Sequence, residues 1–502
     1  MSNLTGFVKR LRDIMRNDAG INGDAQRIEQ IAWMLFLKVY DAKEQDWAWE
    51  DENYQSIIPQ ACRWQNWAHD DKSGKAMTGD KLLDFVNNRL FPVLKGRDIE
   101  DSNGKIQIPG VRVDASTPIS KAIVQTTFAD ANQYMKDGVL LRQVLNIIDE
   151  LDLSDYEESH AFGEIYETIL KELQSAGSAG EFYTPRSIVK LMIMLLAPQA
   201  GESVYDPACG TGGMLIEAIR YMKGDKLTYG RIYGQEKNLA TSAIARMNLF
   251  LHGAKDFRVT QGDTLRSPNY LWRGSLQTFD CVVANPPFSL KNWGAEQFSS
   301  DIYGRNLWGC PTDSNGDFAW LQHMVKSMNP KTGRCAVVLP QGVLFRSGKE
   351  GEIRKQLVES DKLECVITLT GGVFYSTGVS ACILFLNNNK NADHRGKICL
   401  IDASGIYTPQ RAQNVMTEED IQKVYSLYSA YEDVIERVKI ATIADIREKD
   451  YTLAINNYIE KKEQETIPPE EVRRQYFEAY EAMLRAEEKM KRLLLDGGYV
   501  SE

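Results

Sequence analysis

The first 155 residues carry hydrophobic side chains at helical spacing. In residues 24–47, DAQRIEQIAWMLFLKVYDAKEQDW, apolar positions recur every three or four residues, which is typical of an amphipathic helix. Little of this region alternates between apolar and polar residues as a half-buried strand does. We therefore predict a helical domain over residues 1–155, with packing or assembly as its simplest role.

Residues 156–404 show a different pattern, in which short apolar runs alternate with helical segments. This alternation predicts βαβ units and a mostly parallel sheet covered by helices on both faces, an α/β fold. The last two runs are joined by GGVFYSTGVS, which is too short for a helical crossover, so they should form an antiparallel pair. The seven strand candidates are residues 202–207, 231–236, 257–263, 279–287, 333–342, 362–371 and 381–388.

Residues 405–502 are mainly helical. TEED at 417–420 is a capping box that opens one helix. A last helix follows IPPEE, stops at DGG, and spaces its apolar residues alternately by four and three. This narrow apolar seam either packs within its own chain or contacts a partner. Its residues are Val472, Tyr476, Ala479, Met483, Ala486, Met490 and Leu493.

Charge and cysteine content narrow the class of protein. The 502 residues have a net charge of −10, so contacts with nucleic acid would have to come from local basic patches or from a more basic partner. The eight cysteines are scattered without a C-x-x-C pair, which indicates reduced core residues and neither a zinc site nor a disulfide framework. Apolar runs reach only seven residues, far short of a membrane span, and no signal-peptide core is present. We expect a cytoplasmic enzyme or complex subunit.

Four polar residues stand at predicted strand ends: Asp206, Glu236, Asp263 and Asn285. Ligands of open α/β sheets bind beyond the carboxyl ends of the strands, so these side chains can converge on one edge. Glu236 could accept hydrogen bonds from ribose hydroxyls, as an acid does in dehydrogenases too, and Asp263 could accept an adenine amino group. Either acid alone fits a solvated strand end or a helix cap equally well, but the pair indicates an adenosine site.

The glycine-rich stretch DPACGTGG, residues 206–213, lies between the first strand and a helix. Glycines at 210, 212 and 213 allow a sharp turn and close approach of a ligand. A G-x-G turn is a weak signal by itself. It lacks the Lys-Ser/Thr ending of a P-loop, which argues against nucleotide hydrolysis.

The segment FDCVVANPPF, residues 279–288, ends an apolar strand on a rigid tip. The prolines restrict the backbone, so the Asn285 carboxamide oxygen and the Pro286 carbonyl would point in fixed directions. Two acceptors at one point suit an exocyclic amino group, and Phe288 can stack on the ring that bears it. A base in duplex DNA would have to be flipped out to reach them. Alone the motif also fits a proline-rich turn, but beside DPACGTGG it favours catalysis by direct in-line transfer.

The chain resembles the modification subunit of type I restriction-modification systems, an S-adenosylmethionine-dependent amino-group DNA methyltransferase with the gamma order of motifs. The resemblance implies a Rossmann-like seven-stranded methyltransferase sheet in residues 156–404, between the helical domain and a region, 405–502, that docks a specificity subunit. The segments that carry it are IAWMLFLKVYDAKE, GEFYTPRSIVKLM, DPACGTGGML, YGQEKN, QGDTL, NPPF, GVFYSTGVSACILFL and DYTLAINNYI.

The resemblance also implies a target and individual roles. The target is a flipped adenine in DNA, which receives the methyl group at N-6. Asn285, Pro286 and Phe288 are the expected catalytic residues, and no metal is expected to take part. The partners are one specificity subunit for two modification subunits, a restriction subunit in the full complex, and no membrane. The residues expected to bind S-adenosylmethionine are Phe182, Tyr183, Thr184, Pro185, Asp206, Gly210, Thr211, Gly212, Gly213, Glu236 and Asp263, the first four at its methionine half.

Several alternatives stay open at this point. Cytosine N-4 transfer uses related chemistry, a protein glutamine or RNA could present a similar planar amide or amine, and the chain could be a catalytically idle scaffold. Cytosine carbon methylation is not expected, because Asn-Pro-Pro stands where Pro-Cys would be required and Cys209 fits a packing role. Residues 291–305 could be a loop that orders on DNA or a mobile surface loop.

Overall fold

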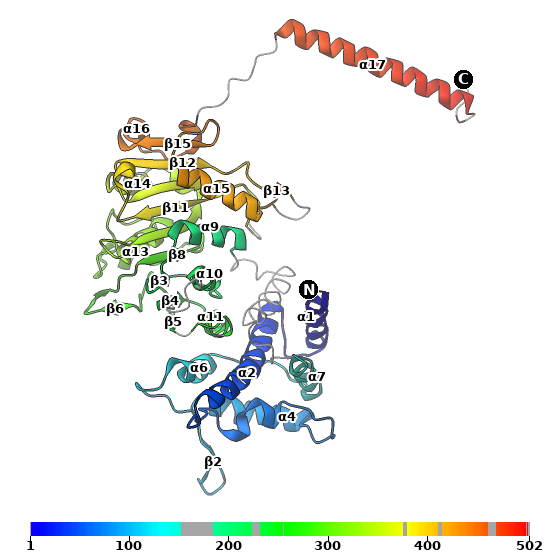
Figure 1. Cartoon of the computed structure of the whole chain (residues 1–502), viewed down its shortest axis with the longest axis vertical. Helices are drawn as coiled ribbons and strands as arrows, with labels where there is room; N and C mark the ends of the chain where they lie inside the picture. Colours follow the sequence, from blue (N-terminus) through cyan, green and yellow to red (C-terminus); the bar gives the residue numbers. More distant parts are fainter. Residues whose placement is uncertain are drawn as a thin grey trace. The chain divides into compact units, whose positions relative to one another are not determined.

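The computed structural model describes residues 2–151, 184–222, 231–254, 256–374, 379–409, 414–459, 468–497 and residue 499. The chain divides into two compact units, Met1–Tyr458 and Ile459–Glu502. Figure 1 shows the helices and strands of both units along the chain. Within these described ranges, no helix combines the length and the apolar character needed to cross a bilayer.

The N-terminal region is helical, as its periodicity predicts. Residues 31–37 of the long helix α2 are buried on all sides, because α3, α7 and α11 (Leu239–Leu251) contact it. Lys38 joins α2 to α7 by a 2.7 Å salt bridge with Asp149. A small hairpin of β1 (Ile99–Glu100) and β2 (Ile106–Ile108) interrupts the helices. The helices are α1 (Ser2–Met15), α2 (Asp24–Glu50), α3 (Trp64–Trp67), α4 (Gly79–Phe85), α5 (Phe91–Leu94), α6 (Ile119–Phe128) and α7 (Gly138–Asp149), with short turns η1 (Gln60–Cys62) and η2 (Val86–Leu90).

The next region is built on one nine-stranded sheet in the spatial order β15-β12-β10-β11-β9-β8-β3-β4-β5 (Figure 1). Its strands are β3 (Ser203–Asp206), β4 (Arg231–Glu236), β5 (Phe257–Gln261), β8 (Cys281–Ala284), β9 (Arg334–Pro340), β10 (Leu363–Thr368), β11 (Ala381–Asn387), β12 (Lys397–Asp402) and β15 (Val438–Thr442).

All seven predicted strands form, and they lie side by side in this sheet. β5, β4, β3, β8 and β9 are parallel neighbours, and β11 is antiparallel to both β9 and β10, which confirms the predicted antiparallel pair. Two strands that were not predicted extend the sheet: β12 is parallel to β10, and β15 is antiparallel to β12. The sheet is therefore mixed and mostly parallel.

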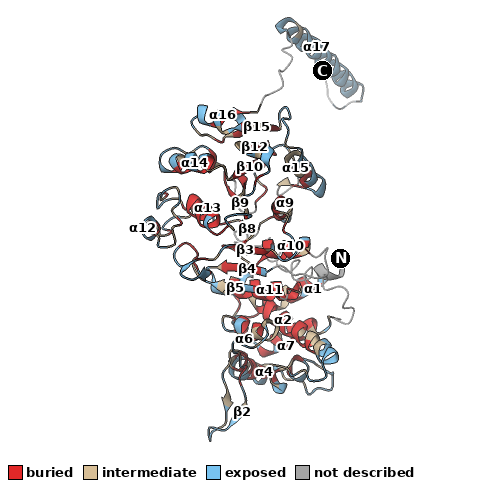
Figure 2. Cartoon of the chain, turned by 60° about the vertical axis from the view of Figure 1, so that its left-hand side comes forward, coloured by how far each residue is buried: buried red, intermediate tan, exposed pale blue. Residues whose placement is uncertain are grey.

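Helices cover both faces of the sheet, as the alternation of strands and helices predicts (Figure 2). One layer contains α9 (Arg186–Leu196), α10 (Gly213–Met222), α11 and α15 (Glu418–Ala430), and the other contains α13 (Asp317–Lys326) and α14 (Lys349–Glu359). The capping box predicted at α15 is present, between Thr417 and Asp420. Smaller elements are α12 (Ala295–Ser299), α16 (Ile443–Glu448), η5 (Gln341–Leu344), η6 (Ala392–His394), η7 (Ile455–Asn457) and the hairpins β6–β7 (Leu271–Trp272, Ser275–Leu276) and β13–β14 (Thr408–Pro409, Asn414–Val415).

The second unit contains the predicted last helix, α17 (Pro469–Asp496), which ends where the DGG sequence begins. None of its residues is buried. Its apolar seam includes five large exposed side chains: Val472, Tyr476, Met483, Met490 and Leu493.

Candidate active site

The four polar residues predicted at strand ends lie along one edge of the sheet. Asp206 and Glu236 are the last residues of β3 and β4, Asn285 follows β8, and Asp263 follows β5. β8, β3, β4 and β5 are consecutive parallel neighbours, about 4.8 Å apart, so their carboxyl ends share this edge. The spacing of these residues along the chain therefore becomes spatial proximity.

The glycine-rich loop after β3 is fastened to the neighbouring strands. Gly210 and Gly212 have φ values of 53° and 86°, a left-handed conformation that glycine adopts without strain. The Gly210 amide donates a 3.0 Å hydrogen bond to the Glu236 carboxylate. The Thr264 hydroxyl donates to the Pro207 carbonyl at 2.6 Å. Thr211 and Gly213 complete the turn into α10, and the Thr211 carbonyl accepts from Asn248 at 2.9 Å.

Burial at this edge disfavours the ionised form of two acids, Asp206 and Glu236. Burial, with a smaller contribution from the nearby Glu236, raises the pKa of Asp206 to about 8, although the hydrogen bond from the Ala208 amide, at 3.0 Å, opposes the rise. Burial likewise raises the pKa of Glu236, against the opposing effect of backbone hydrogen bonds. A ligand that brings positive charge or hydroxyl donors to this edge would stabilise both carboxylates.

Asp263 is engaged by nearby cations. Its carboxylate lies 2.9 Å from the Lys237 ammonium and 3.8 Å from the Arg266 guanidinium, and it also accepts the Arg266 amide at 3.2 Å. Hydrogen bonding of an adenine amino group here would therefore share or displace one of these contacts.

The predicted catalytic tip, residues 285–288 (NPPF), is tied to the residues that precede α9. The Asn285 side-chain nitrogen donates to the Thr184 hydroxyl at 2.8 Å. The Asn285 side-chain oxygen is buried and has no hydrogen-bond partner within the described residues. Pro185 is buried at the start of α9, whereas Phe182 and Tyr183 lie outside the described residues. The amide thus presents an unused acceptor at the strand edge.

The aromatic end of the tip is held in place from two sides. The Phe288 ring meets Phe374 edge to face, with centroids 5.9 Å apart at 69°. The next residue, Ser289, has a left-handed φ of 50° and donates its amide to the buried Asp317 carboxylate at 2.7 Å. Arg346 completes this brace at 3.1 Å from Asp317. Burial raises the pKa of Asp317, and Arg346 opposes that rise.

Sequence reasoning missed the bracing residues Asp317, Arg346 and Phe374. Asp317 is the first residue of α13, a position where an acid fits an ordinary helix start, and Arg346 follows a strand without any polar pattern of its own. Phe374 lies within the segment GVFYSTGVSACILFL, so the resemblance was the one signal that could have identified it.

Residues 291–305 form a largely exposed surface segment that a few buried side chains hold in place, and whether it orders further on DNA stays a prediction. Trp293 and Phe298 are buried and contact each other at 5.2 Å. The buried Arg305 pairs with Asp301 at 2.6 Å and donates to the Thr264 carbonyl at 3.0 Å. This segment is therefore anchored beside the strand edge without DNA.

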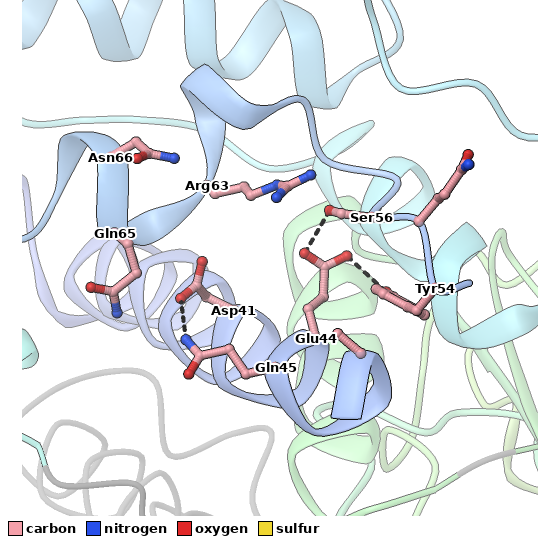
Figure 3. A pocket seen from close by; sticks show the side chains of 10 residues that line it. Asp41, Glu44, Gln45, Tyr54, Ser56, Arg63, Gln65 and Asn66 are labelled. Carbon is pink, nitrogen blue, oxygen red and sulfur yellow. Dashed lines mark hydrogen bonds between the residues drawn. The ribbon is translucent and has the colours of Figure 1, made fainter. Parts of the chain in front are cut away.

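A cavity of about 600 Å³ lies elsewhere, at the end of α2 (Figure 3). Its two acids are already engaged: Glu44 accepts from the hydroxyls of Tyr54 at 2.8 Å and Ser56 at 2.6 Å, and Asp41 accepts from Gln45 at 3.2 Å. Because these polar groups satisfy one another, we place the chemistry at the strand edge and not in this cavity.

Comparisons with known proteins bear on the same regions. A family model described as N-6 DNA Methylase matches residues 157–466, and a model of the HsdM N-terminal domain matches residues 4–148. The methylase subunit of the type I restriction enzyme EcoEI from Escherichia coli is 39% identical over 402 residues, which cover 77% of this chain and 75% of that protein.

Two solved structures are similar over most of the chain. A modification subunit assigned to a type I restriction enzyme of Vibrio vulnificus YJ016 has a TM-score of 0.70 at 28% identity, covering 89% of this chain and 93% of that one. A chain from a structural description of the assembly and conformational transition of the type I restriction-modification system has a TM-score of 0.69 at 26% identity, covering 98% of both chains.

Proposed function

The chain belongs to the N-6 DNA methylase family of type I restriction-modification systems, and from this premise we propose how its residues carry out the reaction. As a member of this family it is a site-specific, adenine-specific DNA methyltransferase and a modification subunit. The roles of its residues, the way it holds its methyl donor and its assembly are our proposals.

The unpaired side-chain oxygen of Asn285 is the observation that carries the proposal. Leaving a buried acceptor without a partner costs about 1–3 kcal/mol, so the chain holds this atom in a state that a hydrogen-bond donor would relieve. The exocyclic amino group of adenine is such a donor. Because the Asn285 nitrogen is held by Thr184, the oxygen is the atom that meets the substrate.

S-adenosylmethionine is the proposed methyl donor, and the residues of the edge fit it. Its ribose hydroxyls suit Glu236, its positive charges suit the acidic edge at Asp206, and its adenine amino group suits Asp263. The glycines at 210 and 212 allow the backbone to approach it, and Phe182 to Pro185 would contact its methionine half. When bound, it supplies an electrophilic methyl group.

Asn285 and Pro286 prepare the target nitrogen for transfer. Their oxygens accept both hydrogens of the flipped adenine's amino group, so its lone pair is drawn out of conjugation with the ring and becomes nucleophilic. Phe288, fixed by Phe374, stacks on the adenine ring. The NPPF segment offers no general base, so the proton passes to solvent after the carbon–nitrogen bond forms.

The choice of DNA sequence is proposed to lie with a partner. The chain has a net charge of −10, and its similarity to a chain of a type I assembly supports a complex with other subunits. We propose two modification subunits for one specificity subunit, with a restriction subunit joining the full complex and α17 as the docking element.

Transfer of tritium from labelled S-adenosylmethionine tests the function. Wild-type chain co-expressed with its specificity partner should label duplex DNA at adenine N-6, and Asn285→Ala should lower the rate by about 10²–10³-fold while cofactor binding persists. Tritium found in cytosine, RNA or protein would show that the chain acts on another substrate. No label from the wild-type complex would mean an idle scaffold and would overturn the proposal.

A further inference from the structure

The loop that follows β9, residues 341–348, stands beside the catalytic tip. β9 is parallel to β8, with Val337 opposite Ala284, so both strands deliver their following loops to the same edge of the sheet. The Asp317 carboxylate joins the two loops, because it accepts the Ser289 amide at 2.7 Å and the Arg346 guanidinium at 3.1 Å. The loop therefore borders the place where a flipped base would enter.

Phe345 is the exposed aromatic residue of this loop. Phe345 is 58% exposed, whereas the preceding Leu344 is 2% exposed. Arg346 is engaged by Asp317 and by Glu350 at 3.3 Å, so it is committed to internal contacts instead of DNA phosphates. The loop thus presents an apolar ring at an edge where stacked bases would approach.

The backbone that carries Phe345 is fixed from behind. Arg354 donates to the carbonyls of Val343 at 3.2 Å and Arg346 at 2.7 Å. The Leu453 amide donates to the Leu344 carbonyl at 2.7 Å. Exposure of the ring is therefore a feature of an anchored loop.

The segment that provides this anchor is itself strained. Asp450 and Tyr451 are consecutive non-glycine residues with φ values of 51° and 53°. Such conformations are sparsely populated and persist where surrounding contacts enforce them, often near functional sites. Here Arg354 donates to the Tyr451 carbonyl at 2.8 Å, and the Tyr451 amide donates to the Ile446 carbonyl at 2.9 Å.

We propose that Phe345 enters the DNA stack and fills the space that the flipped adenine leaves, an inference that rests on the proposed function. Proteins that distort DNA commonly insert apolar side chains between bases, and extrusion of a base leaves such a space. Phe288 cannot take this role, because it packs against Phe374 and is proposed to stack on the extruded adenine itself. Phe345 is thus a positioning residue: it favours the extruded state of the target and leaves the chemistry to Asn285.

The test compares two duplexes in single-turnover methylation by the complex with its specificity partner. In one the target adenine is paired, and in the other it faces an abasic site, so that extrusion needs less unpairing. Phe345→Ala should slow transfer about tenfold on the paired duplex and by less than about threefold on the abasic one. Phe345→Leu should restore most of the rate, and Trp272→Ala, which removes an exposed aromatic side chain in the β6–β7 hairpin, should leave both rates unchanged.

Three results would overturn the inference. Phe345→Ala could match wild type on the paired duplex, it could lose the same factor on both duplexes, as a purely structural defect would, or it could fail to assemble with the partner, which would mark a protein contact. An inactive wild-type complex would instead reject the proposed function, so the two failures are distinguishable.

Discussion

The orientation of the Asn285 amide depends on one hydrogen bond, the 2.8 Å contact from its nitrogen to the Thr184 hydroxyl. Without this acceptor the amide could rotate and present its nitrogen to the amino group of the substrate. Thr184→Val removes the hydroxyl at nearly constant volume, and we expect it to lower kcat about tenfold to a hundredfold, because misplacement of a reacting group has effects of that size.

Steady-state methylation assays with the assembled complex check this expectation. Thr184→Ser keeps a hydroxyl and should restore most of kcat. Because Thr184 is also proposed to contact the methionine half of S-adenosylmethionine, KM for the cofactor should rise in Thr184→Val, but by a smaller factor than kcat falls. A rise in KM with kcat unchanged would contradict the orienting role of Thr184 and leave it only the cofactor contact.

The raised pKa of Asp206 predicts that cofactor affinity depends on pH. In the free chain the pKa is about 8 against an ordinary value of 3.8, so the folded state holds a proton that the unfolded state releases between these values. Folding stability contributed by this group therefore falls as pH rises from about 4 to about 8. A cationic ligand favours the carboxylate, so its Kd should decrease as pH rises from 6 to 8, by at most about tenfold per pH unit, and level off above that.

Isothermal titration calorimetry in two buffers with different ionisation enthalpies measures the protons released on binding. Below pH 8 the wild-type chain should release protons on binding S-adenosylmethionine, and Asp206→Asn should lose most of that release. A wild-type Kd that stays constant from pH 6 to 8 would contradict the prediction.

The individual strands show which parts of the sheet can be predicted from local sequence patterns and which cannot. The central strands were predictable because each is a short apolar run bounded by turn residues, and the antiparallel β11 followed from the short connection before it. β15 was not predicted, because its five residues, Val438–Thr442, lie between helices and its burial does not alternate regularly. It is the outermost strand of the sheet and pairs with β12 through contacts that no local pattern specifies.

The candidate site likewise contains some residues that could be placed from the sequence and others that could not. Asp206, Glu236 and Asn285 could be placed together from sequence, since each ends a strand and parallel strands end at one edge. The contact between Thr184 and Asn285 could not, because 101 residues separate them and only the packing of α9 beside the sheet brings them together. The brace from Asp317 to Arg346 depends in the same way on how α13 and the loop after β9 meet.

The chain as a whole combines a site that acts on DNA with a net negative charge. At a net charge of −10, general attraction to DNA is weak, so a partner has to supply much of the phosphate contact and the choice of sequence. Such a partner needs a docking surface on this chain. α17 offers one, because 28 residues form an amphipathic helix whose apolar seam is exposed.

Two paired substitutions on α17 test this role in assembly. Met483→Glu with Met490→Glu places charges on the seam, where burial against a partner would stabilise each Met side chain by about 1.5–3 kcal/mol. Arg485→Glu with Arg492→Glu changes charges at the same spacing but about 200° around the helix, on its polar side. The seam variant and a deletion of residues 467–502 should lose co-purification with the specificity partner, whereas the polar-side variant should keep it. All three should still bind S-adenosylmethionine, since none of the residues that we assign to the cofactor lies in α17. A deletion variant that assembles normally would refute docking through α17.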